Sequence, residues 1–82
     1  MTDDDIAKVF IEELTRIAPD IDPASVGPDA HLQQDLEIDS MDFLNLVAAL
    51  HKRLGVDIPE ADYPQIATLS LATAYLSGRV GG

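Results

Sequence analysis

The 82 residues are enough for one small domain, and we expect residues 1–82 to fold as a single unit. Fifteen acidic residues against five basic ones give a formal net charge of −10, which disfavours nucleic acid and anionic membrane surfaces as direct partners. The absence of cysteine excludes a disulfide framework and a thiolate metal site, and an apolar content of 46% excludes a disordered tail.

The beginning of the chain, Met1 to Asp5, has neither the basic segment nor the apolar core of a secretory signal peptide. No apolar run is long enough to span a membrane. We therefore expect a cytoplasmic protein, and a monomer. Its negative charge favours partner enzymes that have basic docking patches.

The first predicted helix covers residues 3–17. Thr2 can cap it, with Asp5 three residues later. The acidic run at residues 3–5 suits the positive end of a helix better than a metal site, because adjacent helical residues do not converge. The predicted buried stripe consists of Ile6, Val9, Phe10, Leu14 and Ile17. The residues expected to face water are Glu12, Glu13 and Arg16.

Residues 18–39 show no sustained periodicity and are predicted to form a long loop, with one helical turn in residues 23–26. The residues expected to hold it against the core are Val26, Leu32, Leu36 and Ile38. Acids at positions 35, 37 and 39 alternate like the start of an EF-hand loop. Ser40 and Leu46 stand where that loop needs glycine and glutamate, which excludes this calcium site.

The second predicted helix covers residues 40–54, with Ser40 as its N-cap and Gly55 ending it. Asp39 and Asp42 lie near the positive end of its dipole. The stripe assigned to the core consists of Phe43, Leu46, Val47, Leu50 and Leu54. A second apolar stripe, on another face, consists of Met41, Leu44 and Ala48.

The surroundings of Ser40 do not predict a self-contained serine–histidine enzyme. A serine hydroxyl becomes a nucleophile when a base lies within hydrogen-bond reach. His51 lies eleven residues further along the same helix, roughly 16 Å away at about 1.5 Å per residue. His31 lies in the preceding loop, and no third orienting group is evident.

After a short link, residues 60–66 predict a third, short helix, in which Pro64 must fall in the first turn or break the helix. Thr68 or Ser70 can cap the last helix, which ends near residues 77–78, and residues 79–82 are expected to fray. The predicted fold is all-α: a small four-helix bundle of three main helices and one short helix, with a long loop between the first two.

The segment Asp39-Ser40-Met41, with Asp35-Leu36 before it and residues 46–50 behind it, resembles the signature of acyl carrier proteins. The link at residues 55–59 and the last two helices are also similar, so the resemblance covers nearly the whole chain. It implies that a separate phosphopantetheinyl transferase attaches 4′-phosphopantetheine to Ser40. The protein would then carry acyl groups as thioesters and would not itself be an enzyme.

The resemblance also implies roles for the neighbours of Ser40. Asp39 and Asp42 would meet basic residues of the transferase and of acyl-processing enzymes, with apolar contacts from Met41, Leu44 and Ala48. An acyl chain is expected to slip between the second and third helices. The residues expected to line that cavity are Leu46, Val47, Leu50, Tyr63 and Ile66.

Three departures from the family pattern leave the pathway open. Glu37 stands where the family usually has glycine, Asn45 where it usually has glutamate, and the second helix ends in a basic run at residues 51–53. Fatty-acid biosynthesis or a related specialised pathway is the first interpretation. The alternatives are a carrier of aminoacyl or polyketide units, and a helical interaction module that is never modified.

Overall fold

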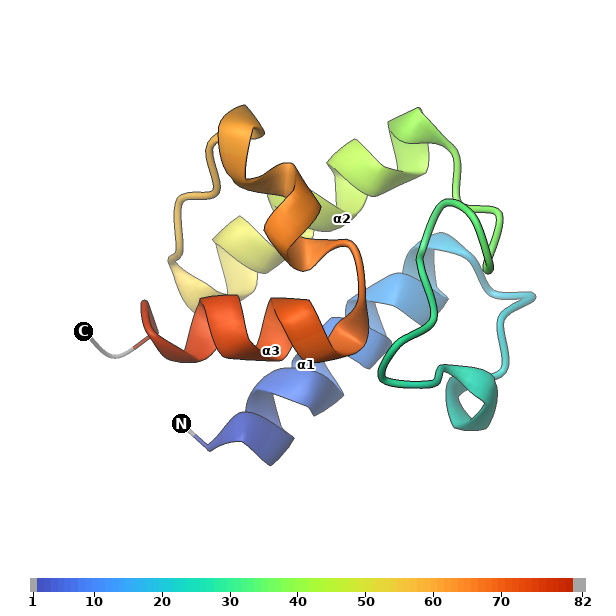
Figure 1. Ribbon diagram of the computed structural model, residues 1–82, viewed down its shortest axis with the longest axis horizontal. Helices are drawn as coiled ribbons and strands as arrows, with labels where there is room; N and C mark the ends of the chain where they lie inside the picture. Colours follow the sequence, from blue (N-terminus) through green and yellow to red (C-terminus); the bar gives the residue numbers. More distant parts are fainter. Residues whose placement is uncertain (1, 81–82) are drawn as a thin grey trace.

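Three α-helices and two 3₁₀-helices make up the computed structural model, which describes residues 2–80 (Figure 1). In chain order they are α1 (Asp3–Ile17), η1 (Pro23–Ser25), α2 (Ser40–Leu54), η2 (Glu60–Ile66) and α3 (Leu69–Ser77). Within residues 2–80 the only bridge of β type is an isolated antiparallel one between His31 and Thr68. The predicted all-α class, with three main helices, a short one and a long first loop, is confirmed.

Local signals set the ends of the helices. The Thr2 hydroxyl accepts a hydrogen bond from the Asp5 amide at 3.2 Å, and the Asp5 carboxylate accepts one from the Thr2 amide at 3.3 Å, which completes a capping box. Gly55 ends α2 in the left-handed conformation, with φ 68°, and Thr68 caps α3. These predicted caps are confirmed.

The core lies where α1 packs against both α2 and α3, and segments of the long first loop cover it. Leu32 in that loop is fully buried, and Val26 and Ile38 are nearly so, which confirms them as anchors. Fully buried large side chains fill its centre: Ile6, Phe10, Leu14, Leu32, Leu46, Leu50, Ile66 and Leu76. Among residues 2–80, no helix has the length and apolar character needed to cross a membrane.

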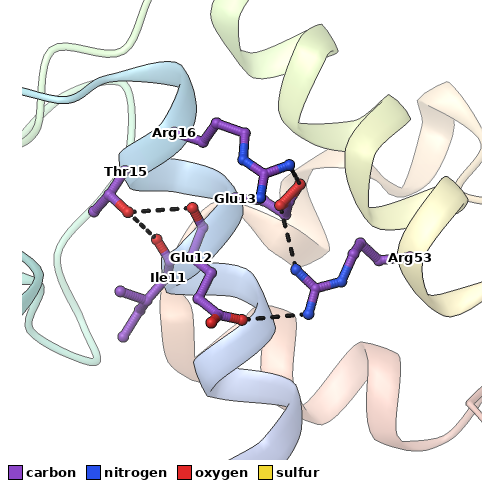
Figure 2. Close-up of polar contacts among 6 residues, drawn as sticks. All are labelled: Ile11, Glu12, Glu13, Thr15, Arg16 and Arg53. Carbon is purple, nitrogen blue, oxygen red and sulfur yellow. Dashed lines mark hydrogen bonds and ion pairs between the residues drawn. The ribbon is translucent and has the colours of Figure 1, made fainter.

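Glu13 corrects one expectation, because it is buried and not exposed to water. Only 3% of its surface is exposed, and its carboxylate lies 3.4 Å from Arg53 Nη1 and 3.5 Å from Arg16 Nη1 (Figure 2). Arg53 also reaches Glu12 at 3.3 Å. Arg16 is a neighbour that the sequence itself supplies, whereas Arg53 reaches Glu13 only through the packing of α2 on α1, and the two positive charges together compensate the burial of the carboxylate.

The segment η2 differs in type from the predicted short helix. It is a 3₁₀-helix with Pro64 in its fifth position, neither in the first turn nor at a break. The tighter helix continues because the Pro64 carbonyl still accepts from the Ala67 amide at 3.4 Å.

The end of the chain is tied to η2 as well. The Tyr75 hydroxyl donates to Asp62 at 2.7 Å, and Arg79 lies over the Tyr75 ring at 3.8 Å. Arg79 also lies 3.9 Å from Asp62, and Val80 packs against the core. The expectation of fraying is therefore wrong for residues 79 and 80, while residues 81–82 lie outside the described range.

Candidate functional site

The loop that leads into α2 is held to the beginning of α3. The Leu32 amide donates to the Ala67 carbonyl at 2.9 Å, and the Ile38 amide donates to the Leu32 carbonyl at 3.0 Å. Both Leu32 and Ile38 are buried. These contacts fix the backbone two residues before Ser40, so the serine stands at a defined place next to α3.

Asp39, and not Ser40, is the N-cap of α2. The Asp39 carboxylate accepts a hydrogen bond from the Asp42 amide at 2.8 Å, and Ser40 is the first helical residue. A carboxylate at this position satisfies an unpaired amide and also favours the positive end of the helix dipole. Among the contacts within residues 2–80, the Ser40 hydroxyl has no hydrogen bond, and Ser40 is exposed.

Glu37 adopts a backbone conformation that usually requires glycine. Its φ is 59°, and it is the only non-glycine residue with positive φ in residues 2–80. In the left-handed region the Cβ atom crowds the following carbonyl oxygen, which costs about 1–2 kcal/mol. The turn before Ser40 is therefore strained at the position where the sequence departs from the family pattern.

Within residues 2–80, neither histidine forms a hydrogen bond with Ser40. His31 Nδ1 accepts from the Gln33 and Gln34 amides, both at 3.2 Å, in a turn of its own loop. His51 Nδ1 lies 3.0 Å from the Val56 carbonyl, at the far end of α2. The arrangement supplies an accessible hydroxyl without a general base, so a partner must supply the base.

The exposed side of α2 next to Ser40 carries both acids and apolar residues. Met41 is 69% exposed and Leu44 48% exposed, and Ala48 is exposed on the same side. Asp39 is exposed and Asp42 is half-buried, and neither forms an ion pair within residues 2–80. The second apolar stripe of α2 therefore does not pack within the bundle.

A hollow of about 540 Å³ opens beside Ser40, and we call it the Ser40 hollow. Its polar lining consists of His31, Gln33, Ser40 and Glu60. Its apolar lining consists of Phe43, Leu44, Tyr63, Pro64, Ala67 and Leu71. The hollow thus joins the first turns of α2 to η2 and to the start of α3.

Of the five residues predicted to line an acyl cavity, Tyr63 alone borders this hollow. Leu46, Leu50 and Ile66 are fully buried and Val47 is 8% exposed, so these four pack in the core. Leu71, 49% exposed, was not predicted at the site. It lies off the buried stripe of α3, and the same reasoning that singled out Met41 would have found it.

Known proteins match this chain over most of its length. A family model described as "Phosphopantetheine attachment site" matches residues 5–76. The chain is 33% identical to an acyl carrier protein of Rubrobacter xylanophilus over 66 residues, which cover 80% of this chain and 82% of that protein.

Two further similar proteins are also acyl carrier proteins. An acyl carrier protein of Wolinella succinogenes is 32% identical over 73 residues, covering 89% of this chain and 90% of the relative. One of Thermosynechococcus vestitus is 30% identical over 74 residues, covering 87% and 91%. With the family model spanning residues 5–76 and three relatives matched over more than four fifths of their length, the chain belongs to the acyl carrier protein family, whose members are carriers and not enzymes.

Proposed function

We propose that Ser40 is the residue to which 4′-phosphopantetheine is attached, and that the chain carries acyl groups between enzymes on that arm. The observation that carries the proposal is the Ser40 hydroxyl itself, exposed at the first position of α2 and left without a hydrogen bond because Asp39 caps the helix. A chain without cysteine must obtain its thiol from an attached group.

The residues around Ser40 fit such an attachment. Ser40 Oγ would bond to the phosphorus of coenzyme A that carries pantetheine, and its proton would pass to a base on the transferase. The bond between the two phosphates would break, and adenosine 3′,5′-bisphosphate would leave. The neighbouring amides at the beginning of α2, with the positive end of its dipole, favour the phosphodiester charge that results. Once bound, the group supplies a thiol that carries acyl groups as thioesters.

The exposed face of α2 is the docking surface that we propose for the transferase and for acyl-processing enzymes. Asp39 and Asp42 would meet basic residues and steer the encounter, as would the net charge of −10. Met41, Leu44 and Ala48 would supply the apolar contact, and a methionine suits a surface that must adapt to several partners.

The test is incubation with a phosphopantetheinyl transferase and coenzyme A, followed by intact-mass and peptide mass spectrometry. We expect a single phosphopantetheine group, located on Ser40. Ser40→Ala should remain unmodified, and Ser70→Ala, which changes an exposed serine on α3, should be modified like the unaltered protein. Modification at another serine, or none with any transferase, would refute the proposal.

The cargo distinguishes the pathways that remain. Transfer of fatty acyl groups by a fatty-acid synthase supports the first interpretation, whereas loading by an adenylation domain or a ketosynthase supports an aminoacyl or polyketide carrier. The cytoplasmic location and the monomeric state remain predictions.

A further inference from the structure

The large apolar side chains that remain exposed gather around Ser40. Within residues 2–80 there are three of them: Met41 and Leu44 on α2, and Leu71 on α3. Met41 follows Ser40 in the chain, and Leu44 and Leu71 line the Ser40 hollow together with Ser40 itself. A single exposed leucine needs no explanation, but three such side chains around one serine indicate a surface that a partner covers.

Leu71 lies off the buried stripe of α3 and keeps about half of its surface in water. The buried residues of this helix are Ala72, Tyr75 and Leu76. Leu69, two positions before Leu71, is half-buried, packs against the core and lines a different hollow, next to the beginning of α1. Residues two apart on a helix point to nearly opposite sides, so Leu69 and Leu71 face different surfaces of the molecule.

The backbone holds Leu71 at a defined place relative to Ser40. The Leu71 amide donates to the Thr68 hydroxyl at 3.1 Å, in the cap of α3. The Ala67 carbonyl, directly before this cap, accepts from the Leu32 amide at 2.9 Å, in the loop that leads to Ser40. A partner that binds at Ser40 therefore meets Leu71 already in position and avoids the entropic cost of ordering a loose segment.

The charges around the hollow suit a basic partner. Glu60 lines the hollow, and Asp39 and Asp42 lie on either side of Ser40 in the chain. None of the five lysine and arginine residues lines it, so a basic partner meets no lysine or arginine there. Apolar side chains at the centre with charged ones at the rim are the usual anatomy of a protein interface.

The transferase is the partner that must cover the surface around Ser40. Acyl-processing enzymes meet the thiol at the far end of the arm, whereas the transferase brings coenzyme A and a base to Ser40 Oγ itself. A standard interface buries about 800 Å² of each partner, about one sixth of the 4830 Å² that this chain exposes. The five residues proposed above for docking all lie on or beside α2, so an interface of that size extends past this helix.

We propose that Leu71 is a docking residue for the phosphopantetheinyl transferase, and that the interface extends from Leu44 on α2 across the Ser40 hollow to Leu71 on α3. This inference rests on the proposed function. Leu71 contributes apolar contact with the enzyme and takes no part in the chemistry at Ser40. It gives α3 a part in the choice of transferase.

The test measures the rate of grafting at saturating coenzyme A while the concentration of the unmodified chain is varied. We expect Leu71→Ser to raise KM about five-fold, because the burial of a half-exposed leucine is lost. The kcat and the melting temperature should not change, since the contact contributes to binding alone. Leu71→Met should restore most of the affinity, and Ala74→Ser, an exposed change on α3 outside the hollow, should leave KM unaltered.

Leu71→Glu separates apolar contact from charge steering. If only charge recruited the basic enzyme, an added carboxylate would lower KM. We expect Leu71→Glu to raise KM by more than Leu71→Ser does, because the interface would bury a carboxylate in place of a leucine.

Methyl NMR spectra of Ser40→Ala locate the contact without turnover, and they need no change at Leu71. Addition of the transferase should shift or broaden the methyl signals of Leu44 and Leu71. Those of Leu69, which faces the other hollow, should stay in place.

The two proposals fail separately. Absence of grafting onto Ser40 with every transferase would refute the proposed function. Grafting with an unchanged KM for Leu71→Ser, a lowered KM for Leu71→Glu, or methyl signals of Leu71 that ignore the transferase would overturn only the contact at Leu71.

Discussion

At the beginning of α2, Asp39 caps the helix and Ser40 presents a free hydroxyl, so the two roles belong to different residues. The Asp39 carboxylate caps α2 through the Asp42 amide, so the Ser40 hydroxyl has no structural hydrogen bond to give up when it is modified. A similar separation occurs on α1, where neighbouring glutamates differ in role. Glu12 is exposed, whereas Glu13 is buried and bridges two arginines.

We predict that Glu13→Gln lowers the free energy of unfolding by about 1–2 kcal/mol, because it removes the charge that Arg16 and Arg53 face at a buried position. Both arginines are partly exposed and can turn to water, so the loss should stay below that of a fully buried pair. Urea denaturation measures it.

Glu12→Gln is the matched control for Glu13→Gln. It makes the same change in net charge at an exposed partner of Arg53, and it should cost less than about 1 kcal/mol. Equal losses in the two variants would show that burial of Glu13 contributes nothing to stability.

At the scale of the elements, the boundaries of α2 decide where the site lies. Asp39 begins the helix directly before Ser40, and Gly55 ends it in the left-handed conformation, with its amide donating to the His51 carbonyl at 2.8 Å. This stop turns the chain towards Val56 and Ile58, both buried, and so brings η2 back to face Ser40.

Gly55→Ala should lower the stability by about 1 kcal/mol. A Cβ atom at Gly55 would meet no neighbour within 4 Å, so the loss comes from its φ of 68° alone. Gly27→Ala, where there is equally open space and no positive φ, should be neutral or up to about 1 kcal/mol stabilising. Thermal melts of both variants check this, and an unchanged Gly55→Ala protein would contradict it.

The contact between η2 and α3 should be sensitive to alkaline pH. Burial raises the pKa of the Tyr75 phenol, as does its hydrogen bond to Asp62, while the charge of Arg79 opposes them. Below about pH 10 the folded and unfolded chains both keep this proton. Above it the unfolded chain releases the proton first, so stability falls as pH rises towards the folded pKa.

Tyr75→Phe should remove this part of the alkaline decline. It should also lower the stability by about 1 kcal/mol at neutral pH, because the hydrogen bond to Asp62 is lost. Urea denaturation of both proteins between about pH 7 and pH 11 measures how steeply the free energy of unfolding of each one falls with pH. Parallel slopes above pH 10 would show that Tyr75 does not contribute to the decline.

At the scale of the whole molecule, repulsion among the excess acidic side chains lowers the free energy of unfolding. All three arginines already form ion pairs with acids, yet the net charge is −10 and most carboxylates repel one another. Within residues 2–80, no group of three or more metal-ligating side chains gathers to bind a cation. Dissolved ions should therefore reduce the repulsion between the carboxylates by general screening and not by binding at one site.

We predict that the melting temperature rises when NaCl is increased from about 10 mM to about 150 mM, since the Debye length falls from about 30 Å to about 8 Å. Magnesium chloride should raise it too. Differential scanning calorimetry measures both effects, and a melting curve indifferent to both salts would contradict the prediction.

The sequence by itself determined the positions of the three α-helices, the Thr2 cap of α1, the Gly55 stop of α2 and the identity of the candidate serine. These follow from short-range patterns: the apolar stripe of α1, the capping box at Thr2, and the glycine at position 55. The four-helix architecture and the resemblance around Ser40 followed from the same local signals.

Only the tertiary structure decided what lies beside Ser40 and what is buried far from it. The Phe43–Tyr63 pair and the Glu13–Arg53 contact join residues 20 and 40 positions apart, and no local periodicity encodes which ring or charge will arrive from another element. The choice of Asp39 over Ser40 as the cap was equally beyond the pattern, because both residue types cap helices well and the path of the incoming loop selects between them.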